Sequence, residues 1–166
     1  MNIQKQAKWL RFFRWLHRKV AIFLFIFFLI ISITGLLLGI KKQTGLLPPT
    51  NMGISSDLST WLPIDSLKKN AFRILSDSVS LNLSTKLDRI DIRPDKGVAK
   101  FVFTNHFNEI QLDGTSGKLL SIKTRKSDFI EKLHDGSILD KVFGTSDDQI
   151  KVSYTVIMAL SLFMLI

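Results

Sequence analysis

Three histidines are the first candidates for chemistry in this sequence, because a neutral imidazole binds metal ions and exchanges protons near pH 7. They are His17, His106 and His134. His134 follows Glu131 in an E-x-x-H pair, the ligand spacing that one helix of a di-iron bundle supplies. Such a centre needs a second pair and two more carboxylates facing it, and the sequence has none. We therefore expect no di-iron site.

Signatures of other catalytic sites are missing from the sequence. The chain has no cysteine, which excludes disulfides and thiolate metal sites. It has no nucleophile elbow, no H-E-x-x-H motif, no paired carboxylates with a basic partner, and no nicotinamide or flavin motif. The sequence favours a non-enzymatic protein, and any redox chemistry would be that of a bound cofactor.

The element that positions His17 is a helix predicted to span a membrane. Residues 20–40 are uncharged and apolar, and a helix of that length measures about 31 Å, close to the hydrocarbon thickness of a bilayer. Residues 1–19 mix basic side chains with tryptophan and phenylalanine, which suits the headgroup layer and its membrane lipid. We expect an interfacial segment at 1–19 and a transmembrane helix at 20–40. His17 would then be an interface histidine.

The distribution of charge sets the expected topology. Of the 23 basic side chains, eight fall within residues 1–42, which hold no acidic one; the rest of the chain is nearly balanced. A nucleic-acid footprint, which needs basic residues clustered on one face of a domain, is therefore not expected. Six of these eight precede the apolar run, which places the N-terminus in the cytoplasm and residues 43–150 outside. A cleavable signal peptide is the alternative, but its apolar region would be shorter and would end in a small-x-small site.

A second apolar run, residues 152–166, lies at the end of the chain. Its length corresponds to about 22 Å of helix, which is short of a span. It is interpreted as the start of a second transmembrane helix that the sequence truncates, with a half-inserted tail as the alternative. The first interpretation gives a transmembrane helical hairpin that encloses the outer domain.

Gly35 and Gly39 lie four residues apart in the first apolar run. Small residues at this spacing let two membrane helices approach closely. The pair therefore suggests an oligomer formed through this helix.

The region between the apolar runs predicts a small α+β domain. Residues 41–61 have the Gly, Pro and Ser/Thr composition of a linker, and apolar residues within 62–76 recur at helical spacing. Residues 86–124 alternate with period two and are divided by polar turns, which indicates an antiparallel meander of four strands. We expect one domain at 62–126, small enough to be only marginally stable alone.

His134 belongs to a predicted amphipathic helical region at 127–145. Its apolar face suits the surface of the outer leaflet. Ser127 or Asp128 is expected to cap its start, and Gly136 is expected to end its first helix. His106 falls in a turn between strands, where we expect a solvated side chain.

This order of elements resembles PepSY-domain proteins of the PepSY-associated transmembrane helix family, and three stretches carry the resemblance. The first is similar to the PepSY module, whose last hairpin carries an Asp…Thr-x-Gly turn: the helix ending Lys69–Ala71, then Asp88–Ile92, Lys100–Phe103 and Glu109–Leu120. Trp15–Lys19 with Thr34–Leu37 is similar to the first helix of the family, entered through a Leu-His-Arg-like step and ending in a Thr-Gly step. Leu133–Gly136 is similar to the Leu-His-x-Gly segment before the second span.

The resemblance implies a bacterial inner-membrane location and kinship with iron-uptake proteins, some of which are haem-containing reductases of ferric siderophores. On that basis His17 and His134 would be haem ligands. His17 precedes the first span and His134 follows the outer domain, so about 30 Å should separate them. We do not expect them to share one haem.

Two functions follow. The favoured one is a membrane-anchored extracytoplasmic PepSY module that binds a partner protein or peptide, for instance by adding its strand to an exposed sheet edge. The alternative is a haem-binding transmembrane electron-transfer component that reduces ferric siderophores. Visible absorption by the protein distinguishes the two functions, since only the second should bind haem.

Overall fold

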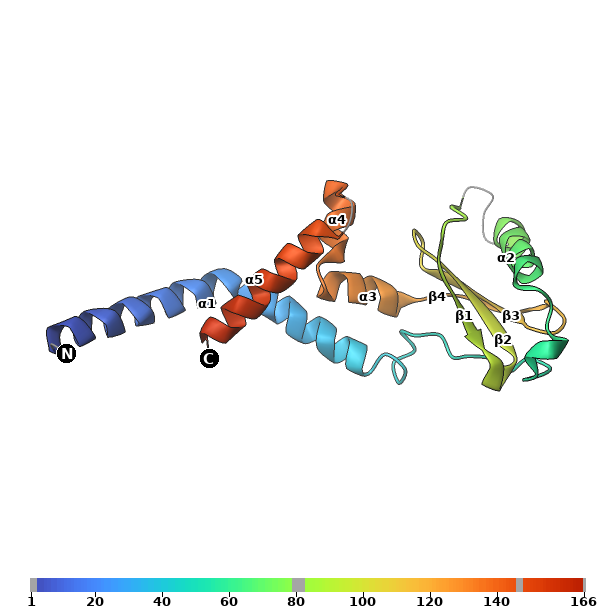
Figure 1. The fold of residues 1–166 in the computed structure, drawn as a ribbon, viewed down its shortest axis with the longest axis horizontal. Coiled ribbons are helices and arrows are strands. Elements are labelled where there is room, and N and C mark those ends of the chain that lie inside the picture. The colour runs from blue at the N-terminus through green and yellow to red at the C-terminus, as the bar shows by residue number, and fades with distance from the viewer. Residues whose placement is uncertain (1–2, 79–82, 146–147, 166) are drawn as a thin grey trace. The chain divides into compact units, whose positions relative to one another are not determined.

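A computed structural model describes residues 3–78, 83–145 and 148–165 of the chain. The chain divides into two compact units, which are treated separately below. The helical unit comprises Met1–Gly39 and Ile130–Ile166, and the sheet unit comprises Ile40–Phe129. Figure 1 shows the elements: α1 (Ile3–Gly39), the 3-10 turn η1 (Leu58–Thr60), α2 (Ile64–Ser78), β1 (Leu87–Arg93), the 3-10 turn η2 (Pro94–Lys96), β2 (Val98–Phe103), β3 (Asn108–Asp113), β4 (Leu119–Thr124), α3 (Lys126–His134), α4 (Ser137–Phe143) and α5 (Gln149–Leu165).

The sheet unit confirms the predicted α+β fold. Its four strands pair antiparallel in the order β1-β2-β3-β4, which is a meander. Ile90 lies opposite Phe101, and Phe101 lies opposite Ile110, so the apolar side chains of neighbouring strands share one face. Gly97 closes the β1–β2 turn with φ 69°, a backbone conformation that glycine adopts at little cost.

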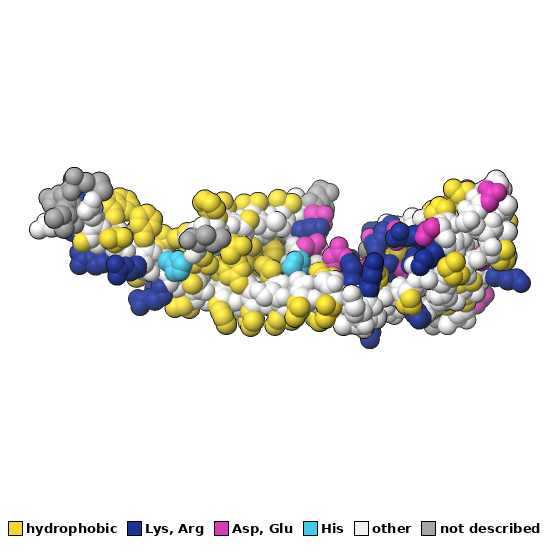
Figure 2. Space-filling view, turned by 90° about the horizontal axis from the view of Figure 1, so that it is seen from below, with side chains coloured by type: hydrophobic (Ala, Val, Ile, Leu, Met, Phe, Trp, Pro, Cys, Tyr) yellow, Lys and Arg dark blue, Asp and Glu magenta, His cyan; other side chains and the backbone are white. Residues whose placement is uncertain are grey.

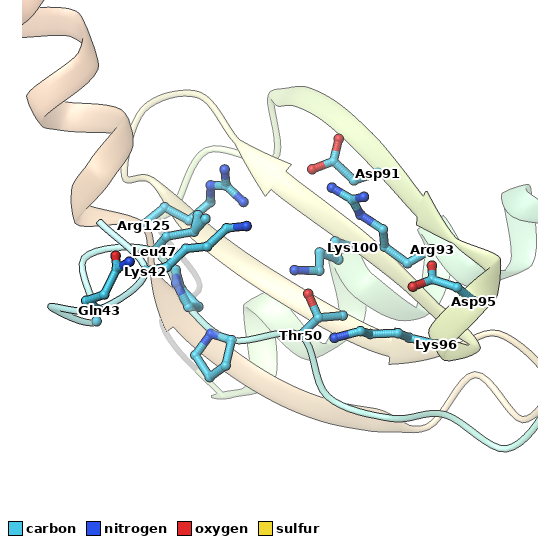
Figure 3. Close-up of a pocket in the computed structure, with 13 residues that line it drawn as sticks. Lys42, Gln43, Leu47, Thr50, Asp91, Arg93, Asp95, Lys96, Lys100 and Arg125 are labelled. Carbon is cyan, nitrogen blue, oxygen red and sulfur yellow. The ribbon is translucent and has the colours of Figure 1, made fainter. Parts of the chain in front are cut away.

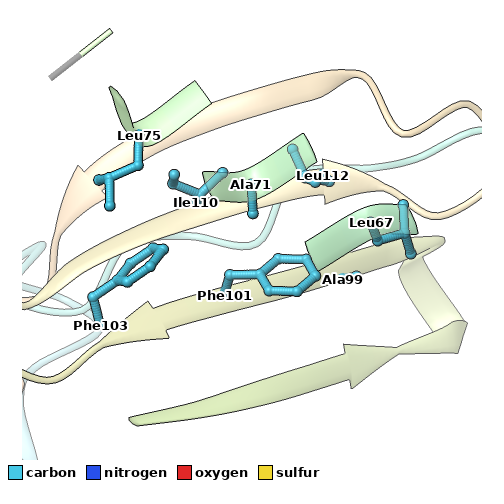
Figure 4. Close-up of a cluster of buried hydrophobic side chains, with 8 residues drawn as sticks. All are labelled: Leu67, Ala71, Leu75, Ala99, Phe101, Phe103, Ile110 and Leu112. Carbon is cyan, nitrogen blue, oxygen red and sulfur yellow. The ribbon is translucent and has the colours of Figure 1, made fainter. Parts of the chain in front are cut away.

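Helix α2 covers one face of this sheet and forms its hydrophobic core. Leu67, Ala71 and Leu75 recur at helical spacing on the side of α2 that meets the sheet, and all three are fully buried. Burying large apolar side chains contributes roughly 1.5 to 3 kcal/mol each, which is what fixes α2 to the sheet. Figure 4 shows the eight residues of this cluster: Leu67, Ala71, Leu75, Ala99, Phe101, Phe103, Ile110 and Leu112.

The second face of the sheet is polar and buried. Residues 46–54, within the segment expected to be a linker, lie along it. The Asn51 N–H donates to Gln111 Oε1 at 2.9 Å, and the Ile54 N–H donates to Asp113 Oδ1 at 2.7 Å. Side chains of β3 therefore satisfy part of the backbone of this segment and hold it in place. The buried polar residues of the second face are Lys100, Glu109, Gln111 and Asp113.

The helical unit leaves most of its apolar surface uncovered. Helix α1 runs as one continuous helix through both the basic segment and the apolar run. Only 11% of its most apolar window is buried, and Phe23, Phe25 and Leu36 are each more than 60% exposed. Figure 2 shows hydrophobic side chains over this unit and Lys and Arg side chains toward its N-terminal end. Within the described residues α1 is the one helix long and apolar enough to cross a membrane, a test that a signal sequence also passes.

The C-terminal helices pack within the same unit. Helix α5 is 17 residues long and lies against α1, with the rings of Phe27 and Tyr154 6.3 Å apart. Helix α3 ends at His134, and Gly136, with φ 77°, separates it from α4. A side chain at Gly136 would meet the ring of Tyr154, so the close approach of α5 also requires glycine there.

The expected N-cap of α3 was wrong. The helix begins at Lys126, so Ser127 and Asp128 lie inside its first turn. The Asp128 carboxylate accepts hydrogen bonds from Arg125 Nε at 3.0 and 2.9 Å and from Arg89 at 3.1 Å. Two guanidinium groups bind this carboxylate more strongly than backbone N–H groups do, because both partners are charged.

Candidate functional site

A groove on the second face of the sheet unit is a candidate ligand cavity among the described residues. We call it the basic groove. It has a volume of about 630 Å³, within the usual range for small-ligand pockets. One wall is the chain from Lys42 to Thr50, and the other is formed by β1, η2 and β2 (Figure 3). Its lining residues are Lys42, Gln43, Gly45, Leu47, Pro48, Pro49, Thr50, Asp91, Arg93, Asp95, Lys96, Lys100 and Arg125.

Cations outnumber carboxylates in this lining. The carboxylates are Asp91 and Asp95, and Asp91 is already paired with Arg89 at 3.6 Å. The basic groove therefore carries a net positive charge. A recess lined mainly by one sign of charge concentrates the field and attracts ions of the opposite sign. The five cations are Lys42, Arg93, Lys96, Lys100 and Arg125.

Three of these cations are free to bind a ligand. The side chains of Lys42, Arg93 and Lys96 make no hydrogen bond or ion pair among residues 3–78, 83–145 and 148–165. Lys42 lies on one side of the groove, with Arg93 and Lys96 on the other (Figure 3). A ligand between the walls can thus be contacted from both sides.

The other two cations are buried and held by Glu109. The Glu109 side chain is 0% exposed, while those of Lys100 and Arg125 are 6% and 10% exposed. Lys100 Nζ lies 3.5 Å from Glu109 Oε1, and Arg125 Nη1 donates to Glu109 Oε2. Gln111 Nε2 donates to Glu109 Oε1 at 2.7 Å and to the carbonyl of Pro49 at 2.8 Å. One carboxylate thus fixes both buried cations, and its neighbour Gln111 ties them to the facing wall.

The pKa values of the two buried cations shift in opposite directions. Burial lowers the pKa of Lys100, and the attraction of Glu109 only partly offsets it, while Arg125 and Arg93 lower it further. Burial also acts to lower the pKa of Arg125, but hydrogen bonds to Glu109 and Asp128 outweigh it and the net pKa is raised. Of the two buried cations, Lys100 is therefore the one whose charge is less fully compensated.

His134 lies in the helical unit against the Thr-Gly step of α1. Its Nδ1 is 2.9 Å from Thr34 Oγ1, and Oγ1 is 2.6 Å from the carbonyl of Ile30. The shorter contact assigns the hydroxyl hydrogen to Ile30, so Oγ1 accepts a hydrogen bond from Nδ1–H. In the neutral imidazole this arrangement leaves Nε2 with its lone pair. A Cβ at Gly35 would lie 3.4 Å from the His134 ring, an ordinary van der Waals distance, so the ring packs closely over this glycine.

Neither of the other two histidines takes part in the contact between His134 and Thr34. His17 is exposed on α1, 17 residues before Thr34, which corresponds to about 26 Å along the helix. His106 belongs to the sheet unit, where its Nε2 lies 3.0 Å from the carbonyl of Ser84 and its ring stacks on Phe103 at 5.3 Å. The expectation of a solvated His106 was therefore wrong, because the ring is half-buried between these partners.

A haem fits this arrangement only in part. A histidine whose Nδ1–H is held by a partner presents Nε2 in the orientation that metal ligands use, so His134 suits one axial position. His17 is too distant to provide the opposite position, and the described residues contain no group of three His, Asp or Glu side chains that could hold a metal ion.

Sequence reasoning missed the basic groove. Lys100 and Glu109 lie on neighbouring strands, and inward-facing charges at alternate positions of β2 and β3 were the signal that could have found it. The wall from Lys42 to Thr50 has no periodic pattern, and its composition resembles a linker. Hydrogen bonds from Gln111 to the carbonyl of Pro49 and from the Ser127 N–H to the carbonyl of Leu46 show that it belongs to the domain.

Comparisons with known proteins assign no family. No family model matches the chain, and neither a curated protein nor a solved structure is significantly similar to it. The resemblance to PepSY-domain proteins stays a prediction from the motifs quoted above. The chain is thus described by its own features: an α+β unit with a basic groove, and a helical unit built on one long apolar helix.

Proposed function

We propose that this chain is a membrane-anchored module whose sheet unit, a PepSY-like domain outside the cytoplasm, binds a partner protein or peptide in the basic groove. In this proposal α1 is the anchor, with its basic end in the cytoplasm of a bacterial cell. The observation that carries the proposal is the set of three unpaired cations, Lys42, Arg93 and Lys96, around a groove of about 630 Å³. Surface cations that served only solubility would have no reason to surround a recess.

The shape of the groove supports an extended ligand. The wall at Leu47–Thr50 contains two consecutive prolines, and proline has no N–H to donate. The groove is bounded on its other side by β1, an edge strand of the sheet. A peptide lying between the two has both an apolar surface and a line of charged side chains to contact.

Selection from a random peptide pool tests this proposal. The full chain in phosphatidylcholine nanodiscs would be equilibrated with the pool, and bound peptides would be identified against empty nanodiscs. We expect selected peptides to lose at least tenfold in affinity for the double variant Arg93→Gln, Lys96→Gln. The control removes two exposed cations that do not line the groove, Lys69→Gln with Lys118→Gln, and should bind normally. Equal binding to both double variants would contradict the proposal, and so would the absence of any selected peptide.

The proposed topology is tested by labelling, which the absence of native cysteine makes clean. Single variants Lys5→Cys and Lys118→Cys would be treated with a membrane-impermeant maleimide in intact cells and after lysis. We expect Lys118→Cys to react in intact cells and Lys5→Cys only after lysis. Intact mass of the purified protein separates an anchor from a signal peptide, since a cleaved chain would lack the N-terminal apolar run.

A second candidate function rests on the contact between Thr34 and His134. A haem-binding electron-transfer component that reduces ferric siderophores would use Nε2 of His134 as one ligand, and the hydrogen bond from Nδ1 to Thr34 fixes the tautomer that this needs. Haem would supply the one-electron chemistry. The visible spectrum of the detergent-extracted protein, oxidised and dithionite-reduced, tests it. A Soret band that weakens in His134→Ala and persists in His17→Ala is expected, and a colourless protein contradicts this function.

A further inference from the structure

The charges of the basic groove specify the chemistry of its occupant more closely than the proposed function does. We infer that the groove binds an acidic peptide segment, whose carboxylates are held by Arg93 and Lys96 on one side, Lys42 on the other and Lys100 between them. This inference rests on the proposed function, because it names the ligand class for the same site.

The four cations lie at different depths in the groove. Arg93 and Lys42 are exposed, Lys96 is half-buried and Lys100 is buried, so the positive charges extend from the rim of the groove to its floor (Figure 3). Arg93 presents a planar guanidinium that pairs with a carboxylate through two hydrogen bonds, whereas the lysines act as point charges. A ligand with several carboxylates can therefore meet these cations at different depths.

The positive charge of Lys100 is only partly compensated by Glu109, which favours a further carboxylate beside it. Four charged groups act on its ammonium or lie near it in the groove lining: Glu109 attracts it, Arg125 and Arg93 repel it, and Asp91 is the cross-strand neighbour of Lys100 on β1. Asp91 is already paired with Arg89. A carboxylate placed beside Lys100 would relieve the repulsion from both arginines without displacing Glu109.

The size of the cavity and its apolar wall favour a peptide over a lone inorganic anion. A volume of about 630 Å³ far exceeds that of one phosphate or carboxylate group, and Leu47, Pro48 and Pro49 line it beside the charges. A peptide supplies carboxylates together with the aliphatic carbons that cover such a wall.

Two matched peptides test the inference on the full chain in phosphatidylcholine nanodiscs. One is acetyl-Gly-Glu-Glu-Glu-Gly-amide and the other replaces each glutamate by glutamine, both with an uncharged fluorescent label for anisotropy. We expect the glutamate peptide to bind at least tenfold more tightly, and its affinity to fall at least tenfold in Arg93→Gln, Lys96→Gln. The control variant Lys69→Gln, Lys118→Gln should leave it unchanged. Both double variants keep the basic N-terminal segment, so the loss in the groove variant shows that the peptide does not bind to that segment. Salt should weaken binding of the glutamate peptide and leave binding of the glutamine peptide unchanged.

Each alternative outcome has a defined meaning. If both peptides bind equally and both lose affinity in the groove variant, the acidic ligand is wrong and the binding module stands. If neither peptide binds, while citrate binds the native chain and loses affinity in Arg93→Gln, Lys96→Gln, the ligand is a small polycarboxylate and the inference is overturned. If peptides selected from the random pool bind the groove variant as well as the native chain, the proposed function itself fails.

Discussion

Replacing Glu109 by glutamine should expose how the floor of the basic groove is held together. The substitution keeps the shape of the side chain and removes its charge. Arg125 keeps the Asp128 carboxylate at 2.9 Å, so it remains paired. Lys100 has no second carboxylate within ion-pair distance among the described residues, so its buried ammonium is left without an opposite charge.

The expected cost follows from that orphaned ammonium. Removing one partner of a buried ion pair typically costs about 3 to 5 kcal/mol. Lysine can limit the loss by releasing its proton: at pH 7.5 this costs about 4 kcal/mol, three pH units at 1.36 kcal/mol each below the ordinary lysine pKa. We therefore expect a loss of about 3 to 4 kcal/mol at pH 7.5, with a further lowering of the pKa of Lys100.

The loss of stability in Glu109→Gln should depend on pH. Where the pKa of Lys100 is lower in the folded state than in the unfolded state, the unfolded state binds more protons, and stability rises with pH up to the unfolded value. At pH 9.5 the cost of a neutral lysine is only about 1.4 kcal/mol. The deficit of Glu109→Gln relative to the native chain should therefore shrink as pH rises from 7.5 to 9.5.

Hydrogen exchange of β2 and β3 in the full chain measures this deficit, because those strands open only when the sheet unit unfolds. A loss of about 3 kcal/mol corresponds to exchange roughly 150-fold faster at pH 7.5. The double variant Glu109→Gln, Lys100→Met removes the orphaned charge and should recover more than half of the loss. A deficit below 1 kcal/mol, or one that does not change with pH, would refute this account of the floor.

Three further predictions follow from contacts elsewhere. Thr34→Val keeps the shape of the side chain but removes the hydrogen bond to His134, so exchange of amides near the end of α3 should rise about fivefold, as expected for a loss of about 1 kcal/mol; unchanged exchange would remove the basis for the assigned tautomer. Gly53→Ala places a Cβ against the carbonyl of Gly97 and 2.7 Å from Asp113 Oδ1. It should release residues 46–54 and destabilise the sheet unit by about 1 to 3 kcal/mol. The control Gly39→Ala, with open space around its Cβ, should be neutral by the same exchange measurement. Burial raises the pKa of Asp113, but hydrogen bonds from Ser116 and the Ile54 N–H outweigh it, so the net pKa is lowered. The contribution of Asp113 to stability is therefore present above about pH 4 and lost as pH falls below that value. Acid unfolding followed by Trp61 fluorescence should be less steep in Asp113→Asn, and an identical acid transition would contradict this.

The sheet and its core were predictable because their signals are local. Strands that alternate apolar and polar residues, with Gly97 and Gly117 in the turns between them, determine both the pairing and the face that meets α2. The helical spacing of Leu67, Ala71 and Leu75 then indicates which side of that helix is buried. Period and turn chemistry are properties of short stretches, so sequence reasoning could read them.

The groove was not predictable in the same way because its parts are far apart in the chain. Nothing near Asn51 indicates that its backbone would bond to Gln111, 60 residues later. The same holds for Thr34 and His134, whose motifs were recognised separately and are brought together only by the packing of the helical unit. Non-local pairs of polar residues carry no periodic signal, so the structure was needed to join them.

The most direct test of the basic groove is hydrogen exchange of the full chain in nanodiscs, with and without the triglutamate peptide. The account predicts slower exchange confined to residues 42–50 and 91–100, with α2 on the opposite face unaffected. Protection of α2, or of the N-terminal basic segment in place of these two stretches, would contradict it and place the acidic ligand elsewhere.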